Sequence, residues 1–387
     1  MNAGGRSGAG GRRLAVPSIE ALPAYQAGKS IEEVAREFGL AEVIKLASNE
    51  NPLGPSPRAV EAIVRAAPGV HRYPDDAAPA LRGALADRHR VAPEQVVLGA
   101  GSTDLVELSV RAFAGAPDHA VISAGSFVAY RLFLCAAGVP FTETPLREFA
   151  VDLDAMAAAV REETTLVFLA NPNNPTGSRF GAAALDRFLA AIPAEVVVVL
   201  DEAYVDFHEA PDAPDSLAVL AVRPRTIVLR TFSKVFGLAG LRLGYAVTAR
   251  PVADVLLRAR RPFAVSRLAI EAGRAALEDE RHRRRTVELT SAGRAFLSSA
   301  LARLGLRVLP SQTNFVAAEI GTPAQATTLA DSLLRRGLIV RPAAAFGLPG
   351  FVRFSVGTER ENRLLAEEIA TVIRDLARLT TEKKDRR

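Results

Sequence analysis

A lysine and a serine stand side by side in a glycine-rich stretch of this 387-residue chain. Residues 231–244 read TFSKVFGLAGLRLG and contain Ser233, Lys234 and Arg242. The apolar run at 226–229 predicts a buried strand, so Lys234 would lie close to the end of that strand. Such a lysine could hold a carbonyl cofactor as a Schiff base, and the serine and arginine could bind an anion. Taken alone, the stretch also fits a solvated lysine in a loop.

A carboxylate follows another strongly apolar run. Residues 196–200 read VVVVL, and Asp201 comes directly after them. An unpaired carboxylate at the end of a buried strand would be costly, so Asp201 needs a cationic or hydrogen-bonding partner. The protonated pyridine nitrogen of pyridoxal phosphate would be a suitable partner. That cofactor needs a carboxylate beside its ring nitrogen in order to withdraw electrons from a substrate. A structural ion pair or a helix cap is the alternative for this residue.

Two more loops follow apolar runs. Residues 99–104 read GAGSTD, and the free N–H groups of the helix predicted to begin there would favour a phosphate, although a helix cap alone would also explain them. The loop superficially resembles a dinucleotide fingerprint. Asp104 stands where the third glycine belongs, which argues against a nucleotide-binding dehydrogenase. Residues 171–177 read NPNNPTG, which turn chemistry alone would explain.

These loops must be positioned by an α/β framework. Apolar runs alternate with helical patterns and are continuous, as expected for strands buried on both faces of a mainly parallel sheet; they lie at 96–98, 120–122, 166–169, 196–200 and 227–229. Ligands of such sheets bind at the carboxyl ends of the strands. Helical stretches at 264–280 and 286–304, followed by short strands and helices, predict a smaller α+β domain. Earlier in the chain, a helical pattern at 31–38 would end at Gly39.

Composition excludes several classes of function. The net charge of +5, from 48 basic and 43 acidic residues, is too small to argue for nucleic acid. The basic run at 281–285 is interpreted as a solvated helix face. One cysteine, Cys135, and five scattered histidines predict no metal site. No apolar run is long enough to span a bilayer, so no membrane contact is predicted and the cytoplasm is the expected compartment.

Taken together, residues 18–376 resemble the fold type I pyridoxal-phosphate aminotransferases, whose Asn-Pro-Thr-Gly, Asp-x-x-Tyr, Ser-Lys and later Arg elements occur here in order. The resemblance is closer to the histidinol-phosphate aminotransferases. It rests on LASNENPLGP at 46–55, RYP at 72–74, GLAGLR at 237–242, and VRP at 340–342 followed by FG at 346–347. It implies an α/β fold: a large domain whose mainly parallel, seven-stranded sheet is flanked by helices, plus a smaller α+β domain.

The resemblance also implies roles for the matching residues, with pyridoxal 5′-phosphate as the cofactor. Lys234 would bind the cofactor and move a proton at the substrate, Asp201 would pair with the pyridine nitrogen, and Tyr204 would tune the cofactor ring. Further cofactor contacts would come from Gly101, Ser102, Thr103, Phe127, Asn174, Ser233, Arg242 and, across a subunit interface, Tyr73. The substrate would be bound by Tyr25, Asn49, Asn314, Arg341 and Arg353.

The implied reaction is transamination in histidine biosynthesis. L-histidinol phosphate and 2-oxoglutarate would be converted to imidazole-acetol phosphate and L-glutamate, or the reverse, on a homodimer with shared active sites. The sequence departs from the family at Thr103, within GSTD, and at Ser126, where a proline-threonine turn is usual; both departures leave substrate choice open. The alternatives are an aminotransferase for an aromatic or other 2-oxo acid, a decarboxylase of a phosphorylated amino acid, and a regulatory relative without cofactor.

Five segments are expected along the chain. Residues 1–15 would be a disordered leader, and residues 16–45 an N-terminal arm that packs with the small domain. Residues 46–262 would form the large cofactor-binding domain, and residues 263–380 the small C-terminal domain. Residues 381–387 would be a charged tail.

Overall fold

The continuous apolar runs form the centre of a seven-stranded sheet. The computed structural model describes residues 14–20, 22 and 28–385. Across the sheet the strands are ordered β2 (Val96–Gly99), β10 (Gly244–Thr248), β9 (Thr226–Thr231), β8 (Val197–Asp201), β7 (Thr164–Ala170), β3 (His119–Ser123) and β4 (Phe141–Thr144). The strand β10 runs antiparallel to both of its neighbours, and the other strands of this sheet run in one direction. The sheet is therefore mainly parallel, as predicted.

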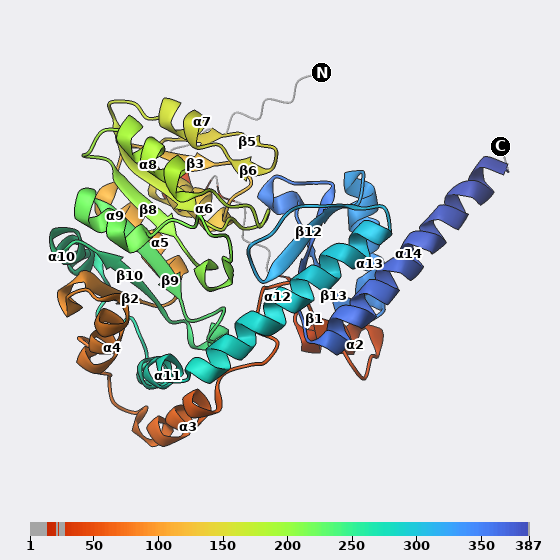
Figure 1. Ribbon diagram of the computed structural model, residues 1–387, viewed down its shortest axis with the longest axis horizontal. Coiled ribbons are helices and arrows are strands. Elements are labelled where there is room, and N and C mark those ends of the chain that lie inside the picture. The colour runs from red at the N-terminus through yellow and green to blue at the C-terminus, as the bar shows by residue number, and fades with distance from the viewer. Residues whose placement is uncertain (1–13, 21, 23–27, 386–387) are drawn as a thin grey trace.

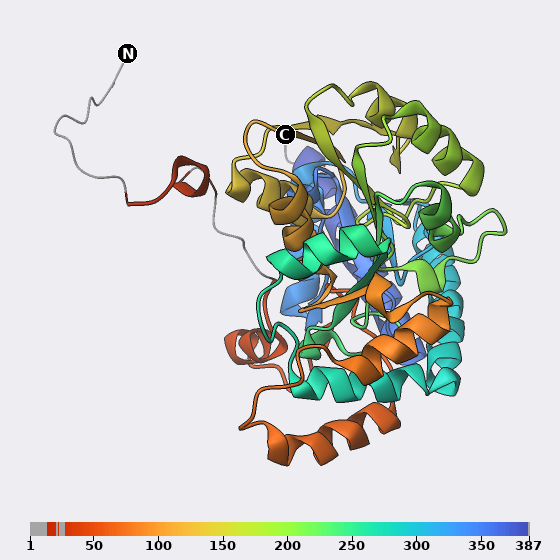
Figure 2. The ribbon, with the colours of Figure 1, turned by 90° about the vertical axis from the view of Figure 1, so that its left-hand side faces the viewer.

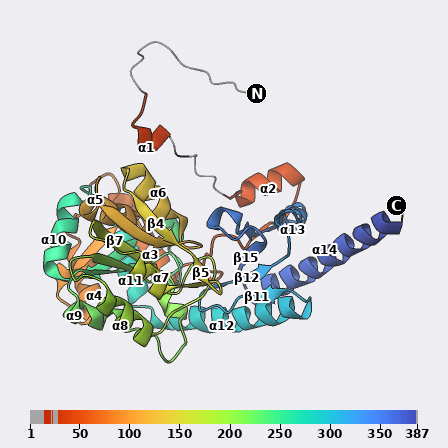
Figure 3. The ribbon, with the colours of Figure 1, turned by 90° about the horizontal axis from the view of Figure 1, so that it is seen from above.

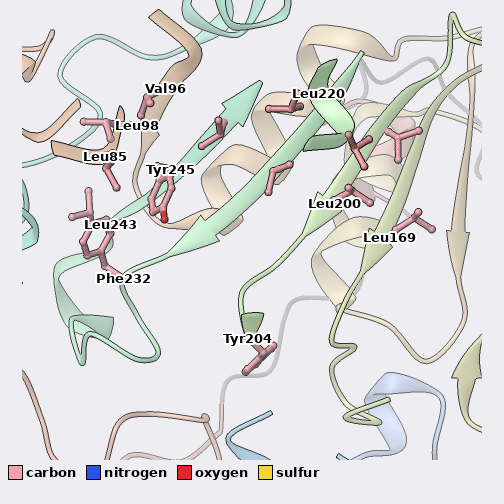
Figure 4. Packing of buried hydrophobic residues seen from close by; sticks show 14 of the residues in the cluster. Leu85, Val96, Leu98, Leu169, Leu200, Tyr204, Leu220, Phe232, Leu243 and Tyr245 are labelled. Atoms are coloured by element: carbon pink, nitrogen blue, oxygen red, sulfur yellow. The ribbon is translucent and has the colours of Figure 1, made fainter. Parts of the chain in front are cut away.

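Helices cover both faces of this sheet (Figure 1), which explains why its strands are apolar throughout. Along β8, Val197 and Val199 belong to one buried cluster, and Val198 and Leu200 to the other. The first cluster includes residues of α5 (Ser102–Phe113), α6 (Val128–Ala137) and α10 (Arg250–Ala259). The second includes residues of α4 (Pro79–His89), α7 (Leu153–Ala158), α8 (Ala182–Ala191), α9 (Ser216–Val222) and α11 (Arg267–Leu277). Figure 4 shows part of the second cluster, including Leu85 and Leu169.

A second, antiparallel sheet lies beside the first. Its order is β11 (Arg307–Val308), β12 (Phe315–Glu319), β15 (Phe351–Ser355) and β14 (Arg341–Pro342). Its core is shared with α12 (Glu280–Arg303), α13 (Pro323–Arg335) and α14 (Glu359–Asp385). The helix α12 runs from the large sheet to the small one (Figure 3). This arrangement is the smaller α+β unit that the sequence predicts.

Several shorter elements lie around these two sheets. They are α1 (Pro17–Glu20), α2 (Ile31–Phe38), α3 (Pro57–Ala66), the parallel pair β1 (Ile44–Lys45) and β13 (Leu338–Ile339), and the hairpin β5 (Leu146–Arg147) and β6 (Ala150–Val151). The hydroxyl of Ser30 caps α2, and Gly39 ends it with a φ of +66°, which confirms the predicted helix stop. No helix in the part of the chain that the structure describes is long and apolar enough to cross a membrane.

The structure corrects the predicted start of α12 and adds one exception to the solvated face predicted for its basic run. The helix begins at Glu280 rather than at residue 286, because the carboxylate of Asp279 accepts the N–H of His282 and caps it. The basic run therefore lies in the first turns of the helix, where Arg281, Arg284 and Arg285 are exposed. Its middle member is different: the guanidinium of Arg283 lies 3.1 Å from the carboxylate of Asp206, in the segment after β8.

Candidate active site

A cavity of about 800 Å³ lies at the carboxyl ends of the parallel strands, between the two sheets. The large sheet supplies Asp201 at the end of β8 and Lys234 just after β9, and the small sheet supplies Arg353 from β15. Twelve of the residues predicted for the site line this one cavity: Asn49, Ser102, Thr103, Phe127, Asn174, Asp201, Tyr204, Ser233, Lys234, Arg242, Arg341 and Arg353. Residues more than 300 positions apart thus face the same space.

The other four predicted residues are placed differently. Gly101 immediately precedes α5 and sits against Arg242. Asn314 is buried behind the cavity wall, where its side-chain amide donates to the carbonyl oxygen of Asn49 over 2.9 Å. Tyr73 is 80% exposed and stacks on Phe263, with ring centroids 4.6 Å apart, so it is available to a second molecule. Tyr25 lies outside the described residues.

The amine of Lys234 is held over the cavity. Its Nζ donates to the carbonyl oxygen of Ser48 at 3.2 Å and lies 5.6 Å from the centre of the Tyr204 ring. Burial, followed by the positive charge of Arg353, lowers the pKa of Lys234 to about 8. A useful fraction of the amine is therefore neutral near pH 7, and a neutral amine can attack a carbonyl.

The carboxylate of Asp201 is 5% exposed and has two neutral donors. The hydroxyl of Tyr130 donates to Oδ2 at 2.7 Å, and the N–H of Ala203 donates to Oδ1 at 3.1 Å. Burial is the largest influence and raises the pKa of Asp201, while these hydrogen bonds lower it. A cation placed in the cavity beside Asp201 would offset the cost of burying its charge.

Tyr130 is a cavity residue, hydrogen-bonded to Asp201, that the sequence interpretation missed. It lines the cavity and is fixed between two aromatic rings, edge-on to Phe127 at 5.7 Å and stacked on Phe168 at 4.8 Å. Its spacing was a usable signal. Tyr130 follows Phe127 by three residues at the start of α6, so both rings lie on the same side of that helix.

The start of α5 has groups that could bind an anion. Gly101 has a φ of +86° and no side chain that could cap the helix, so the first N–H groups of α5 remain available to a ligand. A Cβ atom at this position would lie 2.6 Å from Nη2 of Arg242. The glycine therefore lets the Arg242 guanidinium approach the N-terminus of α5. The guanidinium and the positive end of the helix dipole would together favour a phosphate.

Two arginines form the opposite wall. Arg341 and Arg353 are directly paired on the neighbouring strands β14 and β15. The guanidinium of Arg353 is buried, donates to the side-chain oxygen of Asn174 and, over 2.6 Å, to the carbonyl oxygen of Ala47. Both guanidinium groups lie against the ring of Phe346, at 5.6 Å for Arg341 and 5.4 Å for Arg353. Paired guanidinium groups of this kind recognise carboxylates and phosphates.

Comparison with known proteins agrees with this geometry. The sequence pattern of the family described as "Aminotransferase class I and II" matches residues 41–369. The chain belongs to this aminotransferase family. The matched region begins before β1 and ends within α14, so it includes every cavity residue described above.

Relatives of this aminotransferase are similar over nearly their whole length. Histidinol-phosphate aminotransferase 2 of Methylococcus capsulatus is 46% identical over 354 residues, which cover 90% of this chain and 95% of that protein. Histidinol-phosphate aminotransferase 2 of Pseudomonas aeruginosa is 45% identical over 362 residues, covering 93% and 98%. The crystal structure of histidinol-phosphate aminotransferase from Sinorhizobium meliloti, in complex with pyridoxal-5′-phosphate, superposes with a TM-score of 0.88 at 31% identity and covers 95% of this chain and 99% of that one.

Proposed function

We propose that this aminotransferase uses pyridoxal 5′-phosphate to convert L-histidinol phosphate and 2-oxoglutarate to imidazole-acetol phosphate and L-glutamate, reversibly, in histidine biosynthesis. One observation carries the proposal: a buried carboxylate, Asp201, and an amine of lowered pKa, Lys234, face one cavity beside the start of α5. The names of the relatives support the choice of substrate. The expected cytoplasmic location stays a prediction.

The residues present suit this cofactor at each of its polar groups. Ser102, Thr103, Ser233 and Arg242, around Gly101, would hold its phosphate. Asp201 would face its pyridine nitrogen, Phe127 would lie against its ring, and Asn174 and Tyr204 would contact its ring oxygen. When bound, pyridoxal phosphate supplies an aldehyde that takes up an amine and a ring that withdraws electrons from the substrate.

Lys234 and Asp201 have different roles in the proposed reaction: Lys234 transfers a proton, and Asp201 stabilises a positive charge. Lys234 would take the proton from the substrate Cα and return it to the cofactor carbon on the other side of the amino nitrogen, which requires an amine that gains and loses a proton near neutral pH. Asp201 would place a negative charge beside the pyridine nitrogen of the cofactor, and the hydroxyl of Tyr130, which donates to Oδ2, would orient that carboxylate. The cavity walls exclude water, which strengthens the attraction between Asp201 and the pyridine nitrogen and the hydrogen bond between Tyr130 and Asp201.

Arg353 and Arg341 bind both substrates. One half-reaction brings the carboxylates of glutamate, and the other brings the phosphate ester of histidinol phosphate. The same paired guanidinium groups on β14 and β15 can accept either anion in a two-point contact. With the phosphate at the two arginines, the imidazole ring of the substrate would contact another wall of the cavity.

The decisive experiment is a panel of acceptors with glutamate as the donor. Imidazole-acetol phosphate is expected to give a kcat/KM at least about a hundredfold above that of phenylpyruvate, because its phosphate brings more negative charge and one more acceptor oxygen to the two arginines than a carboxylate does, and its imidazole ring adds polar nitrogens that a phenyl ring lacks. The reverse order would assign the enzyme to aromatic 2-oxo acids, and release of carbon dioxide would indicate a decarboxylase. In the Lys234→Ala variant, visible absorbance with added cofactor and turnover are both expected to be lost. The matched variant Lys29→Ala, which removes another lysine that lines the same cavity, is expected to keep the absorbance.

We further propose that the chain forms a homodimer through exposed apolar residues near α3, here called the α3 patch. Its members are Val60, Val64, Val70, Tyr73 and Phe263, each at least 43% exposed. The helix α3 lies at the outer edge of the large unit, beside α11 (Figure 2), so a second copy can reach it. In such a dimer Tyr73 would reach the phosphate site of the partner molecule, which would account for a tyrosine left in solvent here.

A further inference from the structure

Asn49 has an unusual backbone conformation and is buried. Its φ is +55°, in the left-handed region that asparagine tolerates better than most residues, and its side chain is 1% exposed. It follows Ser48, the residue whose carbonyl accepts the Lys234 amine. The substrate contact that the resemblance implies for Asn49 stays a prediction, and both ends of its side-chain amide are hydrogen-bonded within the protein.

Ser355 fixes the orientation of the Asn49 amide. The backbone N–H of Asn49 donates to Oγ of Ser355 at 2.8 Å, and Oγ of Ser355 lies 2.8 Å from Oδ1 of Asn49. Oγ of Ser355 accepts the backbone N–H and donates its single proton to Oδ1, so it serves as acceptor and donor to the same residue. The oxygen of the Asn49 amide therefore faces Ser355, and the nitrogen faces the other way.

The nitrogen of this amide then determines what Tyr204 does. Nδ2 of Asn49 lies 2.9 Å from Oη of Tyr204, and an amide nitrogen can only donate. Burial raises the pKa of Tyr204, so its hydroxyl keeps a proton at neutral pH. Since Oη accepts from Asn49, its own proton is free for an acceptor in the cavity that Tyr204 lines. Figure 4 shows Tyr204 beyond the ends of the strands.

We propose that Asn49 is a positioning residue, which makes Tyr204 a hydrogen-bond donor toward the cavity. This inference rests on the proposed function, under which the acceptor is the ring oxygen of pyridoxal phosphate. The hydrogen bonds from Ser355 to Asn49 and from Asn49 to Tyr204 form a chain that begins on β15, two residues after Arg353. It connects the strand that carries the proposed substrate arginine with the cofactor side of the cavity.

Asn49→Asp is the sharpest variant, because it keeps the shape of the side chain and reverses the hydrogen bond. A carboxylate can only accept, so the Tyr204 proton would turn from the cavity to residue 49. A hydrogen bond donated to the cofactor ring oxygen stabilises negative charge there and lowers the pH midpoint of the visible band. In the protein with added pyridoxal phosphate, Asn49→Asp and Tyr204→Phe are each expected to raise that midpoint by about one pH unit.

A double-mutant cycle separates this effect from the new charge itself, which would also raise the midpoint. If aspartate acts by capturing the Tyr204 proton, Asn49→Asp adds little in a Tyr204→Phe background, and the double variant matches Tyr204→Phe alone. The uncharged variant Asn49→Ala is expected to shift the midpoint less than either single variant. Fully additive shifts, or no shift in Asn49→Asp, would overturn the proposal.

A second measurement makes no use of the cofactor. The chain has five tyrosines, so labelling their Cζ atoms with ¹³C gives few signals, and Tyr204→Phe identifies the one from Tyr204. That signal is expected to move in Asn49→Asp, while those of Tyr130 and Tyr245 stay in place. If wild-type protein gives no visible band with pyridoxal phosphate, the proposed function is wrong, whereas an unmoved Tyr204 signal contradicts the role of Asn49.

Discussion

The amine of Lys234 should control how the protein takes up its cofactor as the pH changes. Only the neutral amine attacks an aldehyde, and its pKa is about 8. The rate at which cofactor-free protein gains visible absorbance should therefore rise about tenfold per pH unit below that pKa and level off above it. An ordinary lysine would level off only above about pH 10.

The cause of the lowered pKa can be checked in the same assay. Burial lowers the pKa of Lys234 most, and the charge of Arg353 comes next. In Arg353→Met the plateau should begin at a higher pH, because a positive charge that disfavours the ammonium form is gone. A plateau at the same pH in both proteins would exclude Arg353 as a cause.

At the residue scale, sequence reasoning found groups that follow buried strands and missed those fixed by distant partners. Lys234 and Asp201 could be predicted because polar residues at the ends of apolar runs are conspicuous. The contact between Tyr130 and Asp201 joins residues 71 positions apart, and the one between Asn49 and Tyr204 joins residues 155 apart. Only the register of the sheet and the packing of α6 bring such pairs together.

The start of α5 requires a glycine, which gives a prediction for this element. In Gly101→Ala the new Cβ would meet Arg242 at 2.6 Å, in a backbone conformation that alanine rarely adopts. We expect the affinity for pyridoxal phosphate, measured by fluorescence titration, to fall at least about tenfold. Gly83→Ala is the matched control, because nothing lies within 4 Å of its Cβ position in α4. It should leave affinity unchanged and raise the free energy of unfolding by about 0.5 kcal/mol.

The ends of β8 and β9 are joined by an ion pair. Glu202, which is 4% exposed, accepts from Nε of Arg230 at 2.9 Å and lies 2.8 Å from its Nη2. Arg230→Met would leave the Glu202 carboxylate buried without its cation, so urea unfolding should show a loss of about 3 kcal/mol.

An exposed pair provides the comparison for this loss. Arg131 and Glu143 are 3.3 Å apart, and the arginine side chain is 63% exposed. Arg131→Met should cost less than about 1 kcal/mol. Equal losses in the two variants would mean that the pair of Arg230 and Glu202 does not fasten the strand ends that carry Asp201 and Lys234.

At the element scale, the sequence predicted central strands better than edges and boundaries. The strands β3, β7, β8 and β9 are buried on both faces and are continuous apolar runs. In contrast, β4 reads FTET and pairs only with β3, so its alternating polar residues gave no run to detect. The start of α12 was missed because the cap at Asp279 precedes a run of charges instead of an apolar pattern.

At the scale of the whole molecule, the division into two units could be predicted, but the border predicted at residues 262 and 263 stays a prediction. The contacts of α11 with α3 and α4 favour a later division, since α11 belongs to the core of the large unit. Leu297 and Leu301 of α12 belong to the core of the small sheet. One continuous helix, α12, therefore contacts both units. A helical pattern in the sequence does not show at which residue the helix leaves one unit and begins to pack against the other.

The proposed dimer gives the last prediction. Sedimentation velocity should show wild-type protein as a pair of 41.1 kDa chains. Val64, which is 66% exposed on α3, would be buried in the pair, so Val64→Asp would place a carboxylate in an apolar contact. The cost of about 2 to 3 kcal/mol corresponds to a dissociation constant on the order of a hundredfold higher. Val222→Asp introduces the same charge at an 82% exposed valine outside the α3 patch and should change nothing.

Cofactor binding connects this dimer to the active site. If Tyr73 completes the phosphate site of the partner, diluting Val64→Asp until it separates into monomers should weaken cofactor binding as well. Tyr73→Phe should weaken binding without dissociating the dimer, because it keeps the ring and removes the hydroxyl that would contact the phosphate. Monomers that bind the cofactor as tightly as dimers would show instead that each chain holds a complete site, and that the exposure of Tyr73 serves only the contact between subunits.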